Sequence, residues 1–215
     1  MNNIKCIIFD FDDTIVYSEQ MKVKEFFNIS KQYGRIGIDF YNENINKRLT
    51  RYEYFNNLSK KIINNTLLNK DNSKLLYHIM LKKFTETITQ KLKETEEILN
   101  IKEFLEFLKK NNYKIFISSK SNTDDIINTL EHKKILKYFN GIYGLNQSKI
   151  KHFNEIMKEK NFTNKEICFI GDSYSDYEVA KEIDCEFIGI LTERDDLKNV
   201  NCLKINYYQK IFCLF

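Results

Sequence analysis

Apolar residues follow two kinds of pattern along this chain, and the patterns divide it into three stretches. Before residue 17 and after residue 97, short apolar runs of strand length alternate with segments whose apolar residues recur every three or four positions. Residues 17–97 show only the second, helical pattern. Alternating strands and helices predict a parallel sheet with right-handed crossovers. We therefore expect an α/β fold: a three-layer, Rossmann-like core of residues 1–16 and 98–215, with an inserted α-helical domain of residues 17–97.

Five strands and four helices are expected in the core, and three helical stripes in the insert. The strand runs are 4–9, 114–117, 141–144, 167–170 and 187–190, and the helical stripes between them are 101–108, 126–130, 153–157 and 179–183. The stripes of the insert are 21–33, which ends at Gly34, then 55–62, and 76–92, for which Asp71, Asn72 or Ser73 offers an N-cap. We interpret the insert as a small helical bundle.

Composition favours a folded protein without a membrane or nucleic-acid surface. Of the 215 residues, 42% are hydrophobic and 30% are charged, which is enough apolar material for a core. The net charge of +4 comes from lysines spread among acids, so no dedicated nucleic-acid surface is expected. No apolar run is long enough to span a bilayer, and the N-terminus lacks a signal-peptide core. The five cysteines show no paired or metal-type spacing, so we expect reduced thiols in a cytoplasmic protein.

Candidate chemistry lies where three of the predicted strands end. Asp10, Asp12 and Asp13 follow the first run, Ser118 and Ser119 the second, and Gly171-Asp172 the fourth, with Asp176 in the same turn and Lys149 before the preceding helix. Ligands of open α/β sheets bind outside the carboxyl ends of the strands, so we expect these side chains to converge. Buried carboxylates need a partner, which indicates a cation or a site open to water. For the first block alone, an acidic turn without function is the alternative.

These blocks resemble the four motifs of the haloacid dehalogenase (HAD) superfamily, and specifically of its Mg²⁺-dependent phosphatases. Their order is that of the family, and the helical insert between the first two motifs resembles its cap domain. The first block matches the pattern hhhDxDxT and the last matches GDxxxD, which are specific, whereas a lone serine or lysine would carry no weight. The matching positions are Asp10, Asp12, Thr14, Ser118, Lys149, Gly171, Asp172 and Asp176.

The resemblance implies a role for each acid. Asp10 would be both nucleophile and Mg²⁺ ligand, forming an aspartyl-phosphate, and Asp12 would be general acid and then base, with its backbone carbonyl on the metal. Asp172 would bind the metal directly, and Asp176 through water or by orienting other ligands. The chemistry agrees, because a phosphate dianion repels an attacking carboxylate, and Mg²⁺, which prefers oxygen ligands, removes that repulsion.

The remaining matched positions are expected to bind the phosphoryl group. Lys149 would neutralise charge on the nucleophile and the phosphoryl group, and Ser118 would bond a phosphoryl oxygen. Thr14 and Ser119 are counted with Ser118 as substrate-binding residues. The amides from Ser119 to Ser121 are expected to open a helix, where they would suit an anion.

Two positions depart from the family pattern. The family's lysine is often followed by proline, whereas Ile150 follows Lys149, and Lys151 is an alternative. Helical phase favours Lys149, because Phe153 lies four residues further on and begins the apolar stripe. Asp13 stands where many members have glycine, and we expect a turn residue there without a catalytic role.

Arginines of the insert are candidates for a substrate contact. Thr50 to Glu53 has the form of a capping box, which makes Thr50 the N-cap and Arg51 the first helical residue. Guanidinium binds carboxylate or phosphate in a bidentate fork. We hypothesise that Arg51, with Arg48, meets the leaving group or the phosphate of the substrate when the cap closes. A surface salt bridge to Glu43 or Glu53 is the alternative.

The expected function is Mg²⁺-dependent hydrolysis of a phosphate monoester through an aspartyl-phosphate. Asp12 argues against the C–Cl hydrolases of the family, which lack an acid two residues after the nucleophile because halide needs no proton. A phosphomutase with the same core is the main alternative, and a non-catalytic module that binds a phospho-ligand is another. A cap that closes over the core suggests that the partner is a small phosphorylated metabolite rather than a nucleic acid or a membrane.

Overall fold

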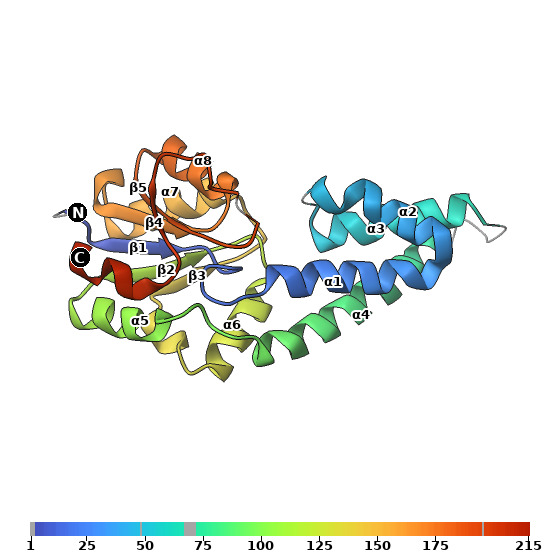
Figure 1. The fold of residues 1–215 in the computed structure, drawn as a ribbon, viewed down its shortest axis with the longest axis horizontal. Helices are drawn as coiled ribbons and strands as arrows, with labels where there is room; N and C mark the ends of the chain where they lie inside the picture. Colours follow the sequence, from blue (N-terminus) through green and yellow to red (C-terminus); the bar gives the residue numbers. More distant parts are fainter. Residues whose placement is uncertain (1–2, 48, 67–71, 195) are drawn as a thin grey trace. The chain divides into compact units, whose positions relative to one another are not determined.

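Six parallel strands form the sheet of the computed structural model, which describes residues 3–47, 49–66, 72–194 and 196–215 (Figure 1). Their order is β3-β2-β1-β4-β5-β6, and all neighbours are paired in parallel. The strands are β1 (Cys6–Phe9), β2 (Lys114–Ser118), β3 (Gly141–Tyr143), β4 (Ile167–Gly171), β5 (Glu186–Ile190) and β6 (Leu203–Ile205). The α/β fold expected from the sequence is confirmed.

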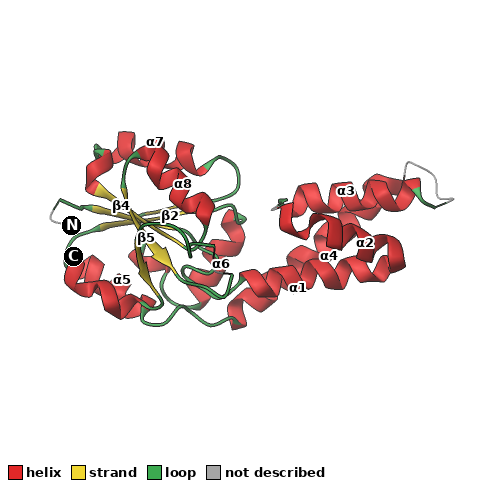
Figure 2. Cartoon of the chain, turned by 45° about the horizontal axis from the view of Figure 1, so that its top comes forward, coloured by secondary structure: helices red, strands yellow, loops and turns green. Residues whose placement is uncertain are grey.

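Helices cover both faces of the sheet, which gives the core three layers (Figures 1 and 2). Helices α5 (Ile101–Lys110) and α6 (Thr123–His132) lie on one face, and α7 (Lys149–Lys160) and α8 (Tyr174–Ile183) on the other. Strand β1 is buried on both faces. Ile8 packs in a cluster with Phe153 and Phe169, whereas the ring of Phe9 lies 6.3 Å from that of Phe104 in α5. Short 3₁₀ helices are η3 (Leu136–Tyr138), η4 (Asn164–Glu166) and η5 (Tyr208–Leu214).

Strand register brings the candidate residues to one edge of the sheet. Phe9 of β1 is paired with Ile117 of β2 and with Ile170 of β4. The residue after β1 and the last residues of β2 and β4 therefore lie at the same level. These residues are Asp10, Ser118 and Gly171.

Two elements near the C-terminus were not predicted. Strand β6 has three residues at the edge of the sheet, and only Ile205 among them is buried, so no apolar run marks it. The segment η5 follows, and its Tyr208 is completely buried, with its ring stacked 5.1 Å from that of Phe104. These isolated apolar residues have neither the strand nor the helical period.

The buried face of α6 is rotated from the one expected. Ile126 and Leu130 are buried as predicted, but Ile127 is only half-buried, and Asp125 and Thr129 take inner positions instead. The hydroxyl of Thr129 donates to the carbonyl of Asp125 at 2.6 Å, which satisfies one of these buried polar groups.

The chain divides into two compact units, Met1–Ser18 with Thr95–Phe215, and Glu19–Glu94. The sequence placed the insert at 17–97, a few residues wider at both ends. The two connecting segments account for the difference, because they pair with each other inside the first unit. The amide of Tyr17 donates to the carbonyl of Glu96 at 3.0 Å, and the amide of Ile98 to the carbonyl of Ile15 at 2.9 Å.

In its described residues, the second unit contains the helices α1 (Glu19–Ser30), α2 (Gly34–Asn44), α3 (Arg51–Asn64) and α4 (Asn72–Glu94), with the 3₁₀ helices η1 (Lys31–Tyr33) and η2 (Ile45–Lys47). Of the N-cap candidates for α4, Asp71 lies outside the described residues. Helix α2 was not predicted, because its two glycines are poor helix formers. Gly37 is nevertheless required, since a Cβ there would lie 1.9 Å from the carbonyl oxygen of Ser30.

Aromatic rings form the core of the second unit. Phe26 of α1 lies 4.5 Å from Phe84 of α4 and 5.5 Å from Phe55 of α3, measured between ring centroids. Tyr54 is buried beside them and shares a 2.8 Å hydrogen bond with the hydroxyl of Ser30. Among the described residues of the whole chain, no helix is both long enough and apolar enough to cross a membrane.

Candidate active site

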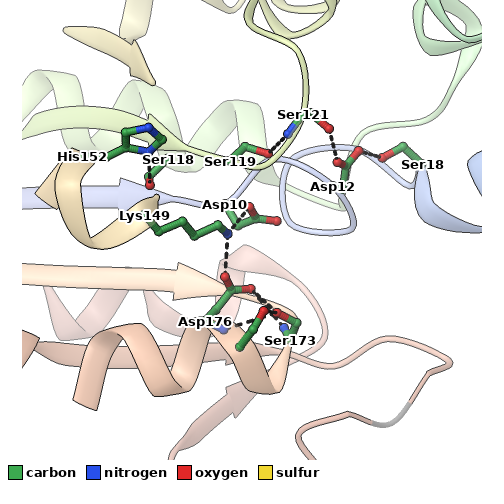
Figure 3. A network of polar contacts seen from close by, with 11 residues as sticks. Asp10, Asp12, Ser18, Ser118, Ser119, Ser121, Lys149, His152, Ser173 and Asp176 are labelled. Carbon is green, nitrogen blue, oxygen red and sulfur yellow. Dashed lines mark hydrogen bonds and ion pairs between the residues drawn. The ribbon is translucent and has the colours of Figure 1, made fainter. Parts of the chain in front are cut away.

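Asp10 and Lys149 form the centre of the candidate site (Figure 3). Asp10 follows β1 directly and is buried, and its amide donates to the carbonyl of Ile170 at 2.8 Å. Lys149 is the first residue of α7, where Ser148 serves as the N-cap. The Nζ atom of Lys149 lies 2.5 Å from Oδ1 of Asp10 and 2.5 Å from Oδ1 of Asp176. Two buried carboxylates therefore share one ammonium group.

Lys149, rather than Lys151, lies beside the carboxylates. The side chain of Lys151 is exposed, and its amide donates to the N-cap hydroxyl of Ser148. Burial lowers the pKa of Lys149, but the negative charges of Asp10 and Asp176 raise it by a larger amount. The pKa therefore stands above its ordinary value. The ammonium group is therefore a fixed positive charge at neutral pH, and its part in catalysis stays a prediction.

The turn after β4 supplies two acids. Asp172 follows Gly171, and Ser173 begins α8 in a capping box with Asp176. One carboxylate oxygen of Asp176 accepts from the hydroxyl of Ser173 at 2.7 Å, and the other accepts from Lys149. Gly171 is required, because a Cβ there would lie 2.7 Å from the Cβ of Asp176. The GDxxxD spacing thus folds the turn so that both acids reach the site.

Asp10, Asp172 and Asp176, which we call the acid cluster, could hold a metal ion, because one ligand oxygen of each lies within 4.8 Å of the others. Burial raises the pKa of Asp10 to about 7, with Lys149 opposing the shift and Asp176 adding to it. Burial, and then repulsion from Asp10, raise the pKa of Asp172 to about 9. A divalent cation would offset this repulsion. Three carboxylates, from the ends of β1 and β4 and the first turn of α8, are hard oxygen donors that fit Mg²⁺.

Asp12 lies on the loop after β1, and its carboxylate points toward two hydroxyl groups (Figure 3). Ser18 donates to one of its oxygens, and Ser121 donates to the other at 2.5 Å. The side chain is only partly buried, unlike that of Asp10. Asp12 is not in the acid cluster, so its predicted metal contact rests on its backbone carbonyl and stays a prediction. Asp13 has a φ of 51° and accepts from the amide of Ser18 at 2.9 Å, as a turn residue would.

Thr14 follows Asp12 and Asp13 on the loop after β1. Its side chain is completely buried, and in the described part of the chain its hydroxyl has no hydrogen-bond partner. The carbonyl of Thr14 accepts from the hydroxyl of Tyr208 at 2.8 Å. This bond ties the loop to η5, and a substrate contact by the side chain of Thr14 stays a prediction.

Ser118 is the last residue of β2 and Ser119 follows it, and both are buried. The hydroxyl of Ser119 accepts from the amide of Ser121 at 3.1 Å. The sequence predicted that the amides from Ser119 to Ser121 begin a helix. They lie instead in a loop before α6. Asn122 is the N-cap of α6, because its side chain accepts from the amide of the second helical residue at 2.8 Å.

His152 is a neighbour of the site that sequence reasoning missed. It is buried, and its Nδ1 lies 2.9 Å from Oγ of Ser118 (Figure 3). It stands three residues after Lys149 on α7, so the two side chains share one face of that helix. The sequence shows this spacing, but it does not show whether a lone histidine on an amphipathic helix belongs to a site or to the core.

Arg51 has the position in α3 that the sequence predicted, while Arg48 lies outside the described residues. Thr50 is the N-cap, and it forms the predicted capping box with Glu53. The side chain of Arg51 is buried, and its guanidinium carbon lies 5.3 Å from the ring centroid of Phe84. A contact of Arg51 with substrate stays a prediction.

Comparison with known proteins identifies the family. Residues 7–190 match the family described as haloacid dehalogenase-like hydrolase. No curated protein sequence matches the chain at a significant level. Since the family match covers most of the chain, this protein belongs to the haloacid dehalogenase-like hydrolases, and the resemblance seen in the four motifs is confirmed.

Solved structures share the fold over nearly the whole chain. One is described as a predicted phosphoglycolate phosphatase from Haemophilus somnus, at 17% identity and a TM-score of 0.74, covering 100% of this chain and 99% of that one. A β-phosphoglucomutase from Clostridium difficile is 20% identical, with a TM-score of 0.72 and coverage of 97% and 93%. A HAD-hydrolase from Bacillus subtilis, described as bound to magnesium, is 16% identical, with a TM-score of 0.65 and coverage of 99% and 98%. At these identities the likeness establishes the fold alone.

Proposed function

We propose that this protein is a Mg²⁺-dependent phosphomonoester hydrolase that works through an aspartyl-phosphate on Asp10. The observation that carries the proposal is the ammonium group of Lys149, held 2.5 Å from Asp10 at the sheet edge where Asp12 also lies. A carboxylate nucleophile, a fixed cation beside it and a separate acid bonded to hydroxyls suit transfer of a phosphoryl group with protonation of the leaving group. Membership of a hydrolase family supports the same reading.

The residues divide the reaction into two steps. In the first, an oxygen of Asp10 attacks phosphorus, the ester P–O bond breaks, and Asp12 gives its proton to the leaving oxygen. In the second, water attacks the phosphorus of the aspartyl-phosphate and passes a proton to Asp12, which frees Asp10 and inorganic phosphate. The hydroxyls of Ser18 and Ser121 hold the carboxylate of Asp12 in place for both proton transfers. Lys149 balances negative charge on Asp10 and on the phosphoryl group.

The acid cluster would hold Mg²⁺, together with the backbone carbonyl of Asp12. When bound, the ion supplies positive charge that reduces the repulsion between a carboxylate and a phosphate dianion. The raised pKa values of Asp10 and Asp172 support this assignment, because a cation would compensate carboxylates that burial and mutual repulsion destabilise. The structural neighbour described as bound to magnesium is consistent with it.

The substrate we propose is a small phosphate ester, with the helical insert acting as a cap. In this view Arg51, with Arg48, contacts the leaving group or the phosphate. The neighbour described as a predicted phosphoglycolate phosphatase is consistent with a small metabolite of this kind. Its identity would be found by measuring phosphate release from a panel of phosphorylated metabolites.

A phosphomutase is the second candidate, and the likeness to a β-phosphoglucomutase favours it. A mutase would use the same nucleophile but pass the phosphoryl group to another hydroxyl of the substrate instead of water. Stoichiometric release of inorganic phosphate from the natural substrate separates the two. The complete set of motif acids argues against a non-catalytic binding module, which would release no phosphate from p-nitrophenyl phosphate with Mg²⁺.

The direct test of the proposal is Asp10→Asn. We expect the variant to fold, by circular dichroism, but to lose turnover of p-nitrophenyl phosphate by several orders of magnitude, since an amide cannot form the acyl phosphate. Asp124→Asn, at an exposed position in the first turn of α6, is the matched control and should keep full activity. Substantial turnover by Asp10→Asn would refute the assignment of the nucleophile.

A further inference from the structure

Ser118 and His152 form a buried pair beside the acid cluster. The side chains are 0% and 2% exposed, and Oγ of Ser118 lies 2.9 Å from Nδ1 of His152 (Figure 3). Ser118 comes from the end of β2 and His152 from α7. The ring of Tyr143 in β3 packs against that of His152, with centroids 5.5 Å apart. The imidazole is therefore held in one place by a hydrogen bond to Ser118 and a ring contact with Tyr143.

The direction of the hydrogen bond between Ser118 and His152 depends on which ring nitrogen carries the hydrogen. A neutral imidazole has only one N–H. In the tautomer with that hydrogen on Nε2, Nδ1 is an acceptor, and Ser118 donates its single hydroxyl proton to it.

This arrangement conflicts with phosphate binding while the ring is neutral. The oxygens of a phosphoryl dianion only accept hydrogen bonds, so Ser118 must donate to bind one. A hydroxyl whose proton is already directed to His152 cannot do so. If the ring takes up a second proton, Nδ1–H donates to the oxygen of Ser118, and the hydroxyl proton is free for the phosphoryl oxygen.

We propose that His152 is a positioning residue that takes up a proton when a dianionic phosphoryl group binds, and so turns the hydroxyl of Ser118 from the ring to the ligand. The inference rests on the proposed function, because it assumes that Ser118 faces phosphate there. The proton comes from solvent, and no covalent bond changes other than the O–H and N–H bonds of this exchange.

The charges around the ring allow such a change. Burial lowers the pKa of His152, Glu155 opposes that shift, and Lys149 adds to it, so the ring without ligand is neutral at pH 7. The hydroxyl of Tyr143 is bonded to Glu159 at 3.3 Å. A dianion next to Lys149 would offset the repulsion between that ammonium group and a protonated ring.

The test is to follow the ring of His152 by NMR in the Mg²⁺-saturated protein, with sulfate as a dianion that does not titrate. The chain has three histidines, and His78 and His132 are exposed, so the ring signals can be assigned by substitution. We expect sulfate to raise the pKa of His152 by one unit or more and to leave the others unchanged. As the pH rises from the pKa of His152 in the sulfate-free protein to its pKa in the sulfate complex, the affinity for sulfate should fall by up to about tenfold per pH unit.

The variant His152→Asn sharpens the test, because its amide can donate to Ser118 at any pH. We expect its sulfate affinity to lose this pH dependence, whereas His132→Asn, an exposed position on α6, keeps the wild-type slope. Sulfate binding that leaves the pKa of His152 unchanged, or an unaltered slope in His152→Asn, overturns the inference while the hydrolase stands. A wild-type protein that binds no sulfate and hydrolyses no phosphate ester overturns both.

Discussion

The two units of the chain treat buried charge in opposite ways. In the first unit, the acid cluster and Lys149 meet at one edge of the sheet, and burial raises the pKa of two of the carboxyls. In the second unit, the buried charges are dispersed. Glu25 is paired with Lys91 at 2.8 Å, which lowers its pKa against the effect of burial, and Arg51 lies over the ring of Phe84.

This difference indicates where each unit carries function. Like charges gathered in a buried place cost stability, and they are kept where a ligand or a reaction needs them. Among its described residues, the second unit pairs Glu25 with Lys91 and packs its aromatic rings at tilted and edge-on angles, so it resembles an ordinary helical bundle. Changes at the sheet edge should therefore affect every substrate, whereas changes in the bundle should affect only the choice of substrate.

Replacing Asp12, the acid on the loop after β1, should have the largest effect on turnover among variants that keep Asp10. For Asp12→Asn we expect turnover of alkyl phosphates to fall by about 10²–10⁴-fold, because their leaving groups need a proton, and that of p-nitrophenyl phosphate to fall far less. Steady-state kinetics on both substrates measures the ratio. Asp13→Asn is the control, because an amide oxygen can still accept from the amide of Ser18. Equal losses on both substrates would exclude Asp12 as the general acid.

Removing the shared cation should come next. For Lys149→Ala we expect kcat to fall by about 10²–10³-fold for all substrates, because a fixed charge at the transferring group is lost. Lys151→Ala, exposed and two residues away, should stay within about twofold of the wild type. The comparison breaks down if Lys151→Ala is the more damaging change, since the helix would then present the other lysine.

The acid cluster should also make the stability of the metal-free protein depend on pH. Since the native pKa values of Asp10 and Asp172 are raised, the native state binds more protons than the unfolded state from pH ~4 to pH ~9, and stability falls as pH rises. In EDTA we expect a Tm at least about 4 °C lower at pH 8 than at pH 5. Adding Mg²⁺ should raise the Tm more at pH 8 than at pH 5. Asp172→Asn should flatten this slope, and a slope equal to the wild type would contradict the account.

The smallest effect is expected in the second unit. For Arg51→Lys we expect KM for the natural substrate to rise by about tenfold, since lysine cannot form the bidentate contact, with p-nitrophenyl phosphate almost unaffected. Arg35→Lys is the control, because that arginine is exposed and paired only loosely with Asp39, at 3.7 Å. Unchanged kcat/KM on the natural substrate would remove Arg51 from substrate binding. Glu43 is itself paired with Lys61 at 2.6 Å, so the alternative salt bridge would have to compete for it.

The parts of the fold that were predictable are those in which burial is continuous. Strands β1 and β4 are buried on both faces, so they read as apolar runs, and α5 buries one regular stripe. Edge strand β6 has no such run. Helix α2 contains Gly34 and Gly37, and the carbonyl of Ser30 lies so close to Gly37 that a Cβ there would clash. Tertiary contacts determine these two elements, and no local sequence pattern predicts them.

For the candidate site, spacing predicted what one turn or one helix end arranges. Asp172 and Asp176 lie in one turn, in which Asp176 forms a capping box with Ser173, and the position of Lys149 follows from helical phase. Contacts between distant segments were beyond such reasoning. The bond from Ser121 to Asp12 joins residues 109 positions apart, and the pairing of Ser118 with His152 depends on how α7 lies against β2.

The hydroxyl of Tyr208 bears on how the protein is made. It donates to the carbonyl of Thr14 across 194 positions of sequence, and this bond secures the loop that carries Asp12. During synthesis the loop is translated well before its partner, which follows 194 positions later. The nascent chain can therefore build the helical bundle and most of the sheet while this loop still lacks its anchor. The loop should accordingly reach its final position only after Tyr208 has emerged and packed beside Phe9 and Phe104.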